Sequence, residues 1–507
     1  MSPATLRIGI DVGGTNTDAA LVDGAGAVLA RTKTPTTDDP AEGIERALAA
    51  VVPADPSAVA TVALGTTHAL NAVLRRRDLG RVAVLRLAAP ATRSVPPFAG
   101  WPDELRASVD SGAWIVAGGV EVDGRTHPLD HDEIRSALER ATGVDAIAIT
   151  GPFSLQDPSQ ELEAAALVAE VLGDVPVSLG HEVGGLGLLE RENAAILNAS
   201  LGRVAALVID GFAKALAAHG LSATPYLSQN DGTMMSVERA RALPALTIGG
   251  GPSNSIRGAV ALTGLTEALV IDVGGTSTDV GAIAQGFPRE SAIGVELGGV
   301  RTNFRMPDVV SVAAGGGTVI SADGTLGLES VGHRLTIEAL VFGGTTTTLS
   351  DVAVAAGRTS MGDPALIRRR SWPEAMEEAD RRVADALDRM KLSRGDAPVV
   401  VVGGGSVLVP EDLPGASEVQ RPDGFDVANA IGAAIGLVSG EAEHVADVGV
   451  GRDDAVASLI EEARDRARAS GADPALLETV WVDEVPLAYM DRPISRLRAK
   501  VAGPPRA

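Results

Sequence analysis

The sequence contains no cysteine. This absence excludes disulfide bonds, thiolate-bound zinc or iron–sulfur centres, and cysteine nucleophiles. It also fits a reducing compartment, and the N-terminal residues lack the basic-then-apolar layout of a signal peptide. We therefore expect a cytoplasmic protein.

Basic residues and long apolar runs are also scarce. The chain has 43 Lys and Arg against 66 Asp and Glu, which gives a formal net charge of -23. An acidic surface repels nucleic acids and anionic lipids. One uncharged stretch, residues 427–440, is rich in glycine and alanine and too short to span a bilayer. We expect no nucleic-acid partner and no membrane insertion.

Length and composition indicate a folded protein of more than one domain. A chain of 507 residues exceeds what one compact core holds, so two or three domains are expected. Hydrophobic residues make up 45% of the chain and charged residues 21%, which excludes a mostly disordered protein.

The most informative feature is an internal duplication. Residues 10–18 read IDVGGTNTD and residues 271–279 read IDVGGTSTD, so the two copies differ at one position. They lie 261 residues apart, which is too far for a solenoid repeat. This spacing favours two half-molecules of similar fold, each carrying one copy.

Each copy lies in the same local pattern. An apolar strand precedes it, a second apolar strand follows it, and a turn such as Asp23-Gly24 comes next. This pattern predicts a strand–loop–strand hairpin and not the strand-to-helix junction of a dinucleotide-binding fingerprint. The dipeptide Gly-Lys occurs nowhere in the chain, so a Walker A loop is absent.

The chemistry of such a loop suits phosphate. Glycines without a Cβ let an anion approach their amide groups, and the threonines add hydroxyl donors. Each hydrogen bond to a charged oxygen contributes about 1.5–3 kcal/mol. A carboxylate beside phosphate would repel it, so Asp11 and Asp272 are predicted to hold Mg²⁺ or Mn²⁺ through water.

The paired hairpins resemble the phosphate loops of the actin, heat-shock chaperone and sugar-kinase superfamily. This resemblance implies an α/β fold in which two ribonuclease-H-like domains enclose an ATP cleft. A glycine-rich loop at the adenosine is then expected, and Gly403-Gly404-Gly405 follows an apolar strand. The resemblance implies that ATP is bound by Gly13, Gly14, Thr15, Asn16, Thr17, Gly274, Gly275, Thr276, Ser277, Thr278, Gly403, Gly404 and Gly405.

Further segments resemble one branch of that superfamily, the ATP-dependent hydantoinases and 5-oxoprolinases. They are GTTHALNA at 65–72, ERENAAILNA at 190–199, QNDGT at 229–233 and GGPSNS at 250–255. The chain is shorter than the large members of that family, whose C-terminal region is mostly missing here. The resemblance implies ATP-dependent opening of a hydantoin or 5-oxoproline-like ring, by phosphorylation of its carbonyl oxygen and attack of water.

The resemblance also assigns roles to single residues. Asp11 and Asp272 would organise the metal, while Asp18 and Asp279 would steady their loops or orient the nucleophile. His68 is placed toward the substrate cleft. The equally weighted alternative is that His68 is only a polar residue at the start of a helix. We count Asp11, Asp272, Asp279 and His68 as candidate catalytic residues.

Two other functions remain open on the same scaffold. One is a small-molecule kinase that releases a phosphorylated product, and the other is a nucleotide switch without catalysis of its own. A small cyclic amide is the expected substrate, and a second hydantoinase subunit and a homo-oligomer are the expected assemblies. Neither the particular ring nor the need for a partner follows from the sequence.

The expected organisation follows from these motifs. Residues 1–185 are predicted to form the first ribonuclease-H-like domain with an insertion, residues 186–445 a connecting helix and the second domain, and residues 446–507 a tail. One long helix is predicted from about residue 188 to 219, and a charged helix and an apolar strand are predicted in the tail. The basic runs 75–77 and 368–370 are interpreted as solvated helix faces.

Overall fold

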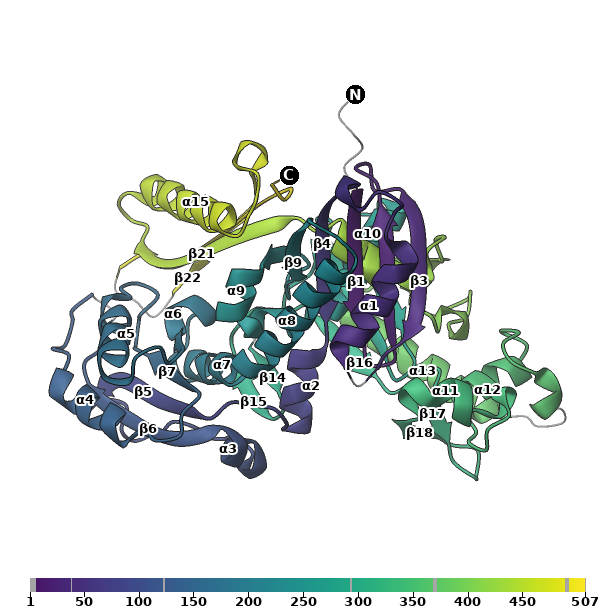
Figure 1. Ribbon diagram of the computed structural model, residues 1–507, viewed down its shortest axis with the longest axis horizontal. Coiled ribbons are helices and arrows are strands. Elements are labelled where there is room, and N and C mark those ends of the chain that lie inside the picture. Colours follow the sequence, from purple (N-terminus) through teal and green to yellow (C-terminus); the bar gives the residue numbers. More distant parts are fainter. Residues whose placement is uncertain are drawn as a thin grey trace.

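The computed structural model describes residues 6–37, 39–121, 124–291, 294–367, 372–487 and 492–506. Within them the chain is a mixed α/β protein, as the sequence predicts (Figure 1). Of the two basic runs, 75–77 lies exposed at the end of α2 (His68–Arg75), while 368–370 lies outside the described residues.

The two near-identical motifs open two sheets with the same strand arrangement. In the first sheet β1 pairs antiparallel with β2 and parallel with β4, and β2 pairs antiparallel with β3. In the second sheet β11 pairs antiparallel with β12 and parallel with β19, and β12 pairs antiparallel with β13 and β16. The duplicated sequence is therefore a duplicated local fold. The strands are β1 Leu6–Val12, β2 Asn16–Val22, β3 Val28–Pro35, β4 Val59–Thr66, β11 Ala268–Val273, β12 Thr278–Ala284, β13 Phe287–Pro288, β16 Val309–Val312 and β19 Ala397–Val402.

The first sheet extends well beyond its hairpin. It has nine strands in the order β22-β23-β21-β10-β9-β4-β1-β2-β3, so strands from both ends of the chain share one sheet. The predicted tail helix and tail strand are present as α15 and β22. The division into 1–185, 186–445 and 446–507 stays a prediction. The added elements are β9 Thr224–Ser228, β10 Met234–Ser236, β21 Val438–Asp447, α15 Arg452–Ala469, β22 Glu478–Pro486 and β23 Ile494–Gly503.

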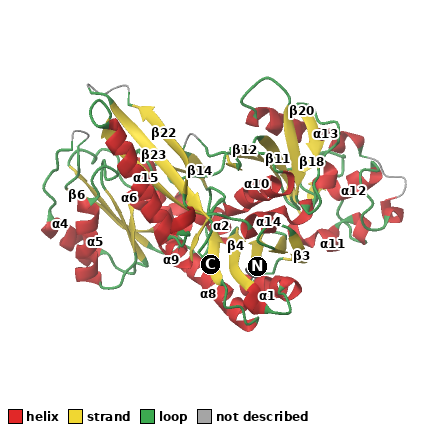
Figure 2. Cartoon of the chain, turned by 90° about the horizontal axis from the view of Figure 1, so that it is seen from above, coloured by secondary structure: helices red, strands yellow, loops and turns green. Residues whose placement is uncertain are grey.

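Two helices cross at the centre of the molecule. These are α10 (Gly250–Thr263) and α14 (Ala428–Ala434), which pack against each other between the two sheets (Figure 2). The crossing is close because a Cβ added to Gly258 would lie 1.9 Å from the Ala428 carbonyl oxygen, and one added to Gly432 would lie 1.9 Å from the Asn254 carbonyl oxygen. The small-residue segment noticed in the sequence thus lets two backbones touch.

The predicted long helix is broken into two. Helix α7 (Leu188–Ser200) and helix α8 (Gly202–Ala218) meet at an angle of 47°. The prediction of one continuous helix is wrong. It rests on the spacing of apolar residues alone, and this spacing takes no account of the glycine at position 202. Glycine lowers the energetic cost of a break in a helix. No single helix among the described residues is both long and apolar enough to cross a membrane, although this bent pair meets the length and composition when its halves are counted together.

A smaller unit is inserted between the strands of the first sheet. Its parallel sheet has the order β6-β5-β7-β8 and is packed against α4 (His131–Arg140) and α5 (Ser159–Leu172). The unit is tied to α7 by a buried ion pair in which Arg86 donates to both carboxylate oxygens of Glu192, at 2.7 and 2.6 Å. The strands are β5 Val82–Ala89, β6 Asp110–Ala117, β7 Ala146–Thr150 and β8 Val177–Leu179.

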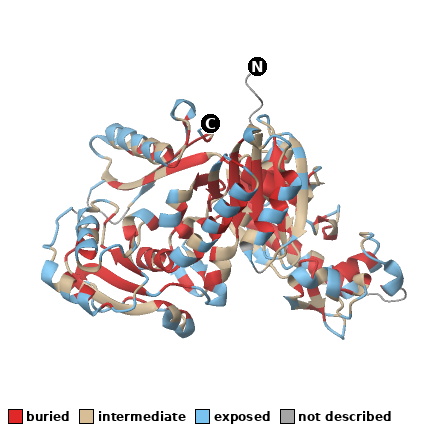
Figure 3. Ribbon diagram, in the orientation of Figure 1, coloured by how far each residue is buried: buried red, intermediate tan, exposed pale blue. Residues whose placement is uncertain are grey.

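The buried residues concentrate in the central strands and the helix faces against them (Figure 3). Ile8 and Ile10 of β1 and Leu64 of β4 are fully buried against α1 (Pro40–Val51) and α8. Full burial of such a side chain contributes about 1.5–3 kcal/mol. The loops that follow β1 and β11 are therefore carried on rigid strands.

Candidate nucleotide site

The two duplicated motifs form the same turn. In each hairpin the aspartates face each other across the strand pair, Asp11 opposite Asp18 and Asp272 opposite Asp279. The turn is closed by a hydrogen bond from the Gly13 amide to the Asn16 carbonyl at 3.0 Å. The equivalent bond from Gly274 to Ser277 is 2.9 Å long.

The two turns face each other across the centre of the molecule. A Cβ added to Gly275 would lie 3.0 Å from Thr15 Cγ2, so the tips of the loops are in contact distance. Among the described residues, none accepts a hydrogen bond from the amides of Gly14, Thr15, Gly275 or Thr276. Four amide donors are therefore available to an anion between the loops.

The second loop is supported from behind by a glycine run. The amides of Gly316 and Gly317 donate to the carbonyls of Gly274 and Gly275, at 3.1 and 2.6 Å. Because these bonds occupy carbonyl oxygens and leave the loop amides free, they hold the loop in an anion-binding orientation. The run of three glycines at 315–317 is thus a close backbone packing against the loop.

Asp11 and Asp18 are held by side chains from α14, α10 and β3. Asn429 donates to both carboxylates at 3.0 Å, and Asn254 donates to the other oxygen of Asp11 at 3.0 Å. Lys33 Nζ lies 2.6 Å from each carboxylate oxygen of Asp18. Burial raises the pKa of Asp11 to about 6 and also raises the pKa of Asp18.

Asp272 and Asp279 occupy the matching positions in the second sheet. Asp272 accepts a hydrogen bond from Ser255 Oγ, and Asp279 accepts one from Ser311 Oγ. Burial raises the pKa of Asp272 and raises the pKa of Asp279 to about 6, with the nearby charge of Asp272 adding to the latter shift. Both hairpins thus present a pair of carboxylates whose charged form is disfavoured.

The third glycine loop lies beside this group. Gly403 has a φ of +85°, and a Cβ there would lie 2.2 Å from Asp272 Oδ1, so only glycine fits. The amide of Gly405 donates to the Val273 carbonyl at 2.8 Å. Gly404 is exposed and faces the Lys33 side chain, since a Cβ there would lie 3.8 Å from Lys33 Cε. All three predicted loops therefore meet at one place.

The charges of this cleft fit a divalent cation. Four aspartates lie together with Lys33, and a cation would favour the charged form of these carboxylates, whose pKa values are raised by burial. Among the described residues, no three His, Asp or Glu side chains form a ready-made ligand set. This suits Mg²⁺, which is commonly bound through one or two carboxylates together with waters and substrate phosphates.

His68 borders a small pocket that none of the three glycine loops lines. It opens α2, and its Nδ1 is 2.7 Å from Thr66 Oγ1. Its neighbours include Val204 of α8 and Leu227 of β9, and burial lowers the pKa of its ring. The amide of Thr67 donates to the Val12 carbonyl at 3.2 Å, which fixes this segment next to the first loop.

Four polar residues of the cleft escaped the sequence analysis as site residues. Asn254 and Ser255 lie in the GGPSNS segment and Asn429 in the small-residue segment, both of which had been noticed for other reasons. Lys33 lies on β3, directly opposite Asp18 of β2 in the antiparallel strand pair. Residues in such a pair lie on the same face of the sheet. A search for polar residues within small-residue helices would have found Asn429.

Comparison with known proteins gives consistent matches. Residues 7–172 match the hydantoinase/oxoprolinase N-terminal region, and residues 191–388 match the hydantoinase/oxoprolinase model. The chain is 30% identical over 368 residues to the caprolactamase subunit alpha of Pseudomonas jessenii, covering 66% of this chain and 51% of that subunit. It is 27% identical over 269 residues to the acetophenone carboxylase gamma subunit of Aromatoleum aromaticum, covering 50% of this chain and 35% of that subunit.

Solved structures extend the likeness of fold over the whole chain. The crystal structure of ATP-dependent caprolactamase from Pseudomonas jessenii matches with a TM-score of 0.75 at 20% identity, over 98% of this chain and 87% of that one. The fold class predicted from the paired hairpins is confirmed by this match. In sequence, the chain spans about half the length of the caprolactamase subunit and about a third of the acetophenone carboxylase subunit.

Proposed function

Because this chain belongs to the hydantoinase/oxoprolinase family, we propose that it uses ATP to open a cyclic amide or imide. The observation that carries this proposal is the meeting of the two Gly-Gly-Thr loops, with unpaired amides at their facing tips. ATP is the phosphoryl donor that such paired loops suit. The ATP-dependent enzyme among the structural matches supports the same choice of donor.

The proposed reaction replaces one hard step by two easier ones. The carbonyl oxygen of the ring forms a bond to the terminal phosphorus as the bond to ADP breaks, which turns a poor leaving oxygen into phosphate. The ring is then hydrolysed: water adds to the carbon and the carbon–nitrogen bond breaks to give an amine and an acyl phosphate, and a second water splits this acyl phosphate into a carboxylate and free phosphate. Phosphoryl transfer needs mainly positioning and charge neutralisation, which are what this cleft offers.

We assign the residues as follows. The loops at Gly13–Thr15 and Gly274–Thr276 hold the triphosphate by their amides. Asp11 and Asp272 would hold Mg²⁺ through water, and this ion would supply neutralisation of phosphate charge. Lys33 fixes Asp18 and adds a positive charge at the mouth of the cleft.

Two further roles stay proposals of the same kind. Asp279 is proposed to orient the attacking group, because it lies opposite Asp272 and accepts a hydrogen bond from Ser311. His68 is proposed to face the substrate, because its segment is fixed against the first loop. The Gly403–Gly405 loop is proposed to contact the adenosine.

A second subunit is proposed as a partner. The two curated relatives are named as subunits, alpha and gamma, of larger enzymes. The chain spans about half the length of the first subunit and about a third of the length of the second. Adding candidate partner proteins to the assay below tests this point.

The test is an assay that follows three products at once. The protein is incubated with Mg-ATP and 5-oxoproline, hydantoins or lactams, and ADP, free phosphate and the opened ring are measured. Ring opening coupled to free phosphate is the expected result. A stable phosphorylated product would identify a kinase, and ATP turnover indifferent to every small molecule would identify a nucleotide switch.

Two matched variants make the assay specific. Asp11→Asn and Asp272→Asn are expected to lower coupled turnover by about 100-fold or more, because each removes a charge that positions phosphate and metal. Asp23→Asn, in the exposed turn after β2, is the control and should leave turnover unchanged. Equal activity of all three variants would contradict the proposed site.

A further inference from the structure

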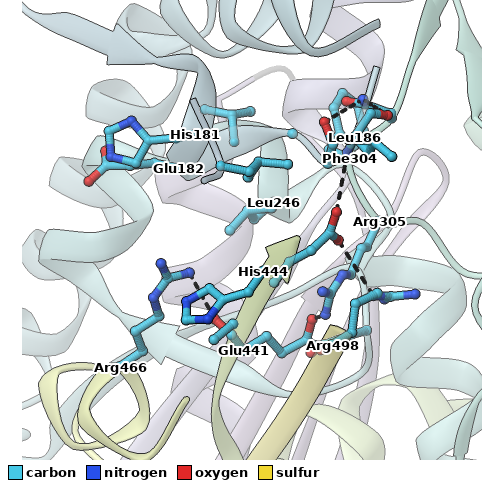
Figure 4. Close-up of a pocket in the computed structure, with 18 of the residues that line it drawn as sticks. His181, Glu182, Leu186, Leu246, Phe304, Arg305, Glu441, His444, Arg466 and Arg498 are labelled. Atoms are coloured by element: carbon cyan, nitrogen blue, oxygen red, sulfur yellow. Dashed lines mark hydrogen bonds and ion pairs between the residues drawn. The ribbon is translucent and has the colours of Figure 1, made fainter. Parts of the chain in front are cut away.

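A second cavity lies away from the nucleotide loops. It has a volume of about 810 Å³ and is enclosed by the inserted unit, the β9–β10 turn and the tail strands β21 to β23 (Figure 4). None of the three glycine loops lines it. Much of its wall comes from residues after 388, where the match to the family model ends.

Most of the charged side chains around this cavity already have partners. Arg498 Nη2 lies 2.9 Å from Glu290, and Arg466 Nη2 lies 2.6 Å from Glu462. His444 also contacts Glu462, at 2.6 Å. Figure 4 shows the Arg305, Glu441 and Arg498 cluster gathered on one side of the cavity. The charges of these paired groups neutralise one another, so these groups need no ligand.

Two arginines are exceptions among these charged groups: Arg496 on β23, whose buried Nε has no hydrogen-bond partner among the described residues, and Arg239. Arg239 lies on α9 (Val237–Ala242) and lines the cavity, yet its guanidinium has no hydrogen bond or ion pair with any described residue. Glu182 acts on it electrostatically without coming within ion-pair distance, and Arg466 opposes it with like charge. A partly buried guanidinium without a partner is costly, and an anion would remove that cost.

The rest of the wall restricts which anion fits. Leu155, Leu186, Leu246 and Phe304 give the cavity an apolar side. Glu182 also lines the cavity, and its carboxylate would repel a doubly charged phosphate more strongly than a singly charged carboxylate. An organic acid with one carboxylate satisfies both conditions, since its charge meets Arg239 and its body meets the apolar wall. The volume lies within the range of small-molecule sites.

We propose that this cavity binds a small monocarboxylic acid, with its carboxylate on Arg239. Arg496, on β23 of the tail, lines the same cavity, and its unpartnered Nε offers a second donor to the carboxylate. The acid released by amide ring opening belongs to this ligand class, although the charge pattern of the cavity stands independently of the proposed reaction. The tail beyond the family match thereby acquires a binding role.

The test compares two probes of equal shape. Pentanoate and its neutral amide, pentanamide, are titrated into the full-length protein by calorimetry, together with inorganic phosphate. Pentanoate is expected to bind at least about tenfold more tightly than pentanamide, because a charged hydrogen bond is lost with the amide. Absence of pentanoate binding, equal binding of the two probes, or tighter binding of phosphate would overturn the proposal.

Two arginines on one helix provide the matched variants. Arg239→Gln is expected to weaken pentanoate binding at least about tenfold. Arg241→Gln should leave it unchanged, because Arg241 is exposed and paired with Asp210. Equal effects of the two substitutions would contradict the assignment. Retained binding of a non-hydrolysable ATP analogue by Arg239→Gln shows that the variant is folded and separates this test from that of the proposed function.

A chemical readout covers the case in which Arg239→Gln does not fold. Phenylglyoxal modifies accessible arginines, and adducts on Arg239 and Arg241 are counted by mass spectrometry in the wild-type protein. Pentanoate is expected to protect Arg239 and not Arg241. Equal modification of Arg239 with and without saturating pentanoate would overturn the proposal.

Discussion

At the scale of single residues, the candidate nucleotide site contains more acidic than basic side chains. Asp11, Asp18, Asp272 and Asp279 converge from two hairpins, and Lys33 pairs with Asp18. Neutral donors from Asn254, Ser255 and Asn429 orient the carboxylates without cancelling their charge. This excess of negative charge favours the binding of a divalent cation together with a phosphate group.

Lys33 gives the first prediction. Lys33→Met is expected to lower coupled ATP turnover by about 100-fold, because one positioned positive charge at a phosphoryl site contributes that much. The ADP release rate at saturating substrate is the measurement. Lys214→Met, on the exposed face of α8, is the control and should keep wild-type activity. Turnover of Lys33→Met within twofold of wild type would remove Lys33 from the site.

Asp279 gives a prediction about pH. Its pKa is raised from an ordinary 3.8 to about 6, so the folded state binds its proton more tightly than the unfolded state. Stability from this group is therefore present at low pH and is lost as pH rises from about 4 to about 6. Asp279→Asn removes this loss.

The measurement is urea unfolding of both proteins without nucleotide and with a chelator present. Relative to wild type, Asp279→Asn should gain about 1–3 kcal/mol in free energy of unfolding between pH 4 and pH 7. A difference that stays constant over this range would show that the Asp279 carboxyl is not shifted upward by burial.

At the scale of elements, the crossing of α10 and α14 positions the site. Asn254 and Ser255 project from one helix and Asn429 from the other, so a change in the crossing moves the donors on three aspartates together. The crossing depends on glycine, because the two backbones touch there. This close contact couples the two sheets to each other.

Gly432→Ala tests this dependence. Its Cβ would lie 1.9 Å from the Asn254 carbonyl oxygen, so the helices must separate. Overpacking of this kind is expected to cost about 3 kcal/mol in free energy of unfolding and to weaken nucleotide binding. Gly202→Ala is the matched control, because nothing lies within 4 Å of its added Cβ. Equal stability of both variants by urea unfolding would contradict the close crossing.

The elements also show what a sequence can predict. The hairpins and the tail helix follow from local patterns, because glycine turns and apolar periodicity act over a few residues. The break at Leu201 between α7 and α8 does not, since apolar spacing continues through it. Lys33 and Asn429 were missed as site residues because strand pairing and helix packing bring them to Asp18 from positions far along the chain.

At the scale of the whole molecule, the duplication explains the architecture. Two sheets of matching strand arrangement each contribute one loop, and the tips of those loops meet. Strands of the tail complete the first sheet and also close the second cavity. One chain therefore carries the proposed nucleotide site at its centre and the proposed organic-acid pocket at its side.

The most direct test of the central claim is a crystal structure of the protein with Mg²⁺ and a non-hydrolysable ATP analogue. The account predicts phosphate oxygens about 3 Å from the amides of Thr15 and Thr276, with the metal between the triphosphate and the aspartates. A nucleotide bound elsewhere, for example in the cavity beside Arg239, or contacts from only one of the two loops, would contradict it.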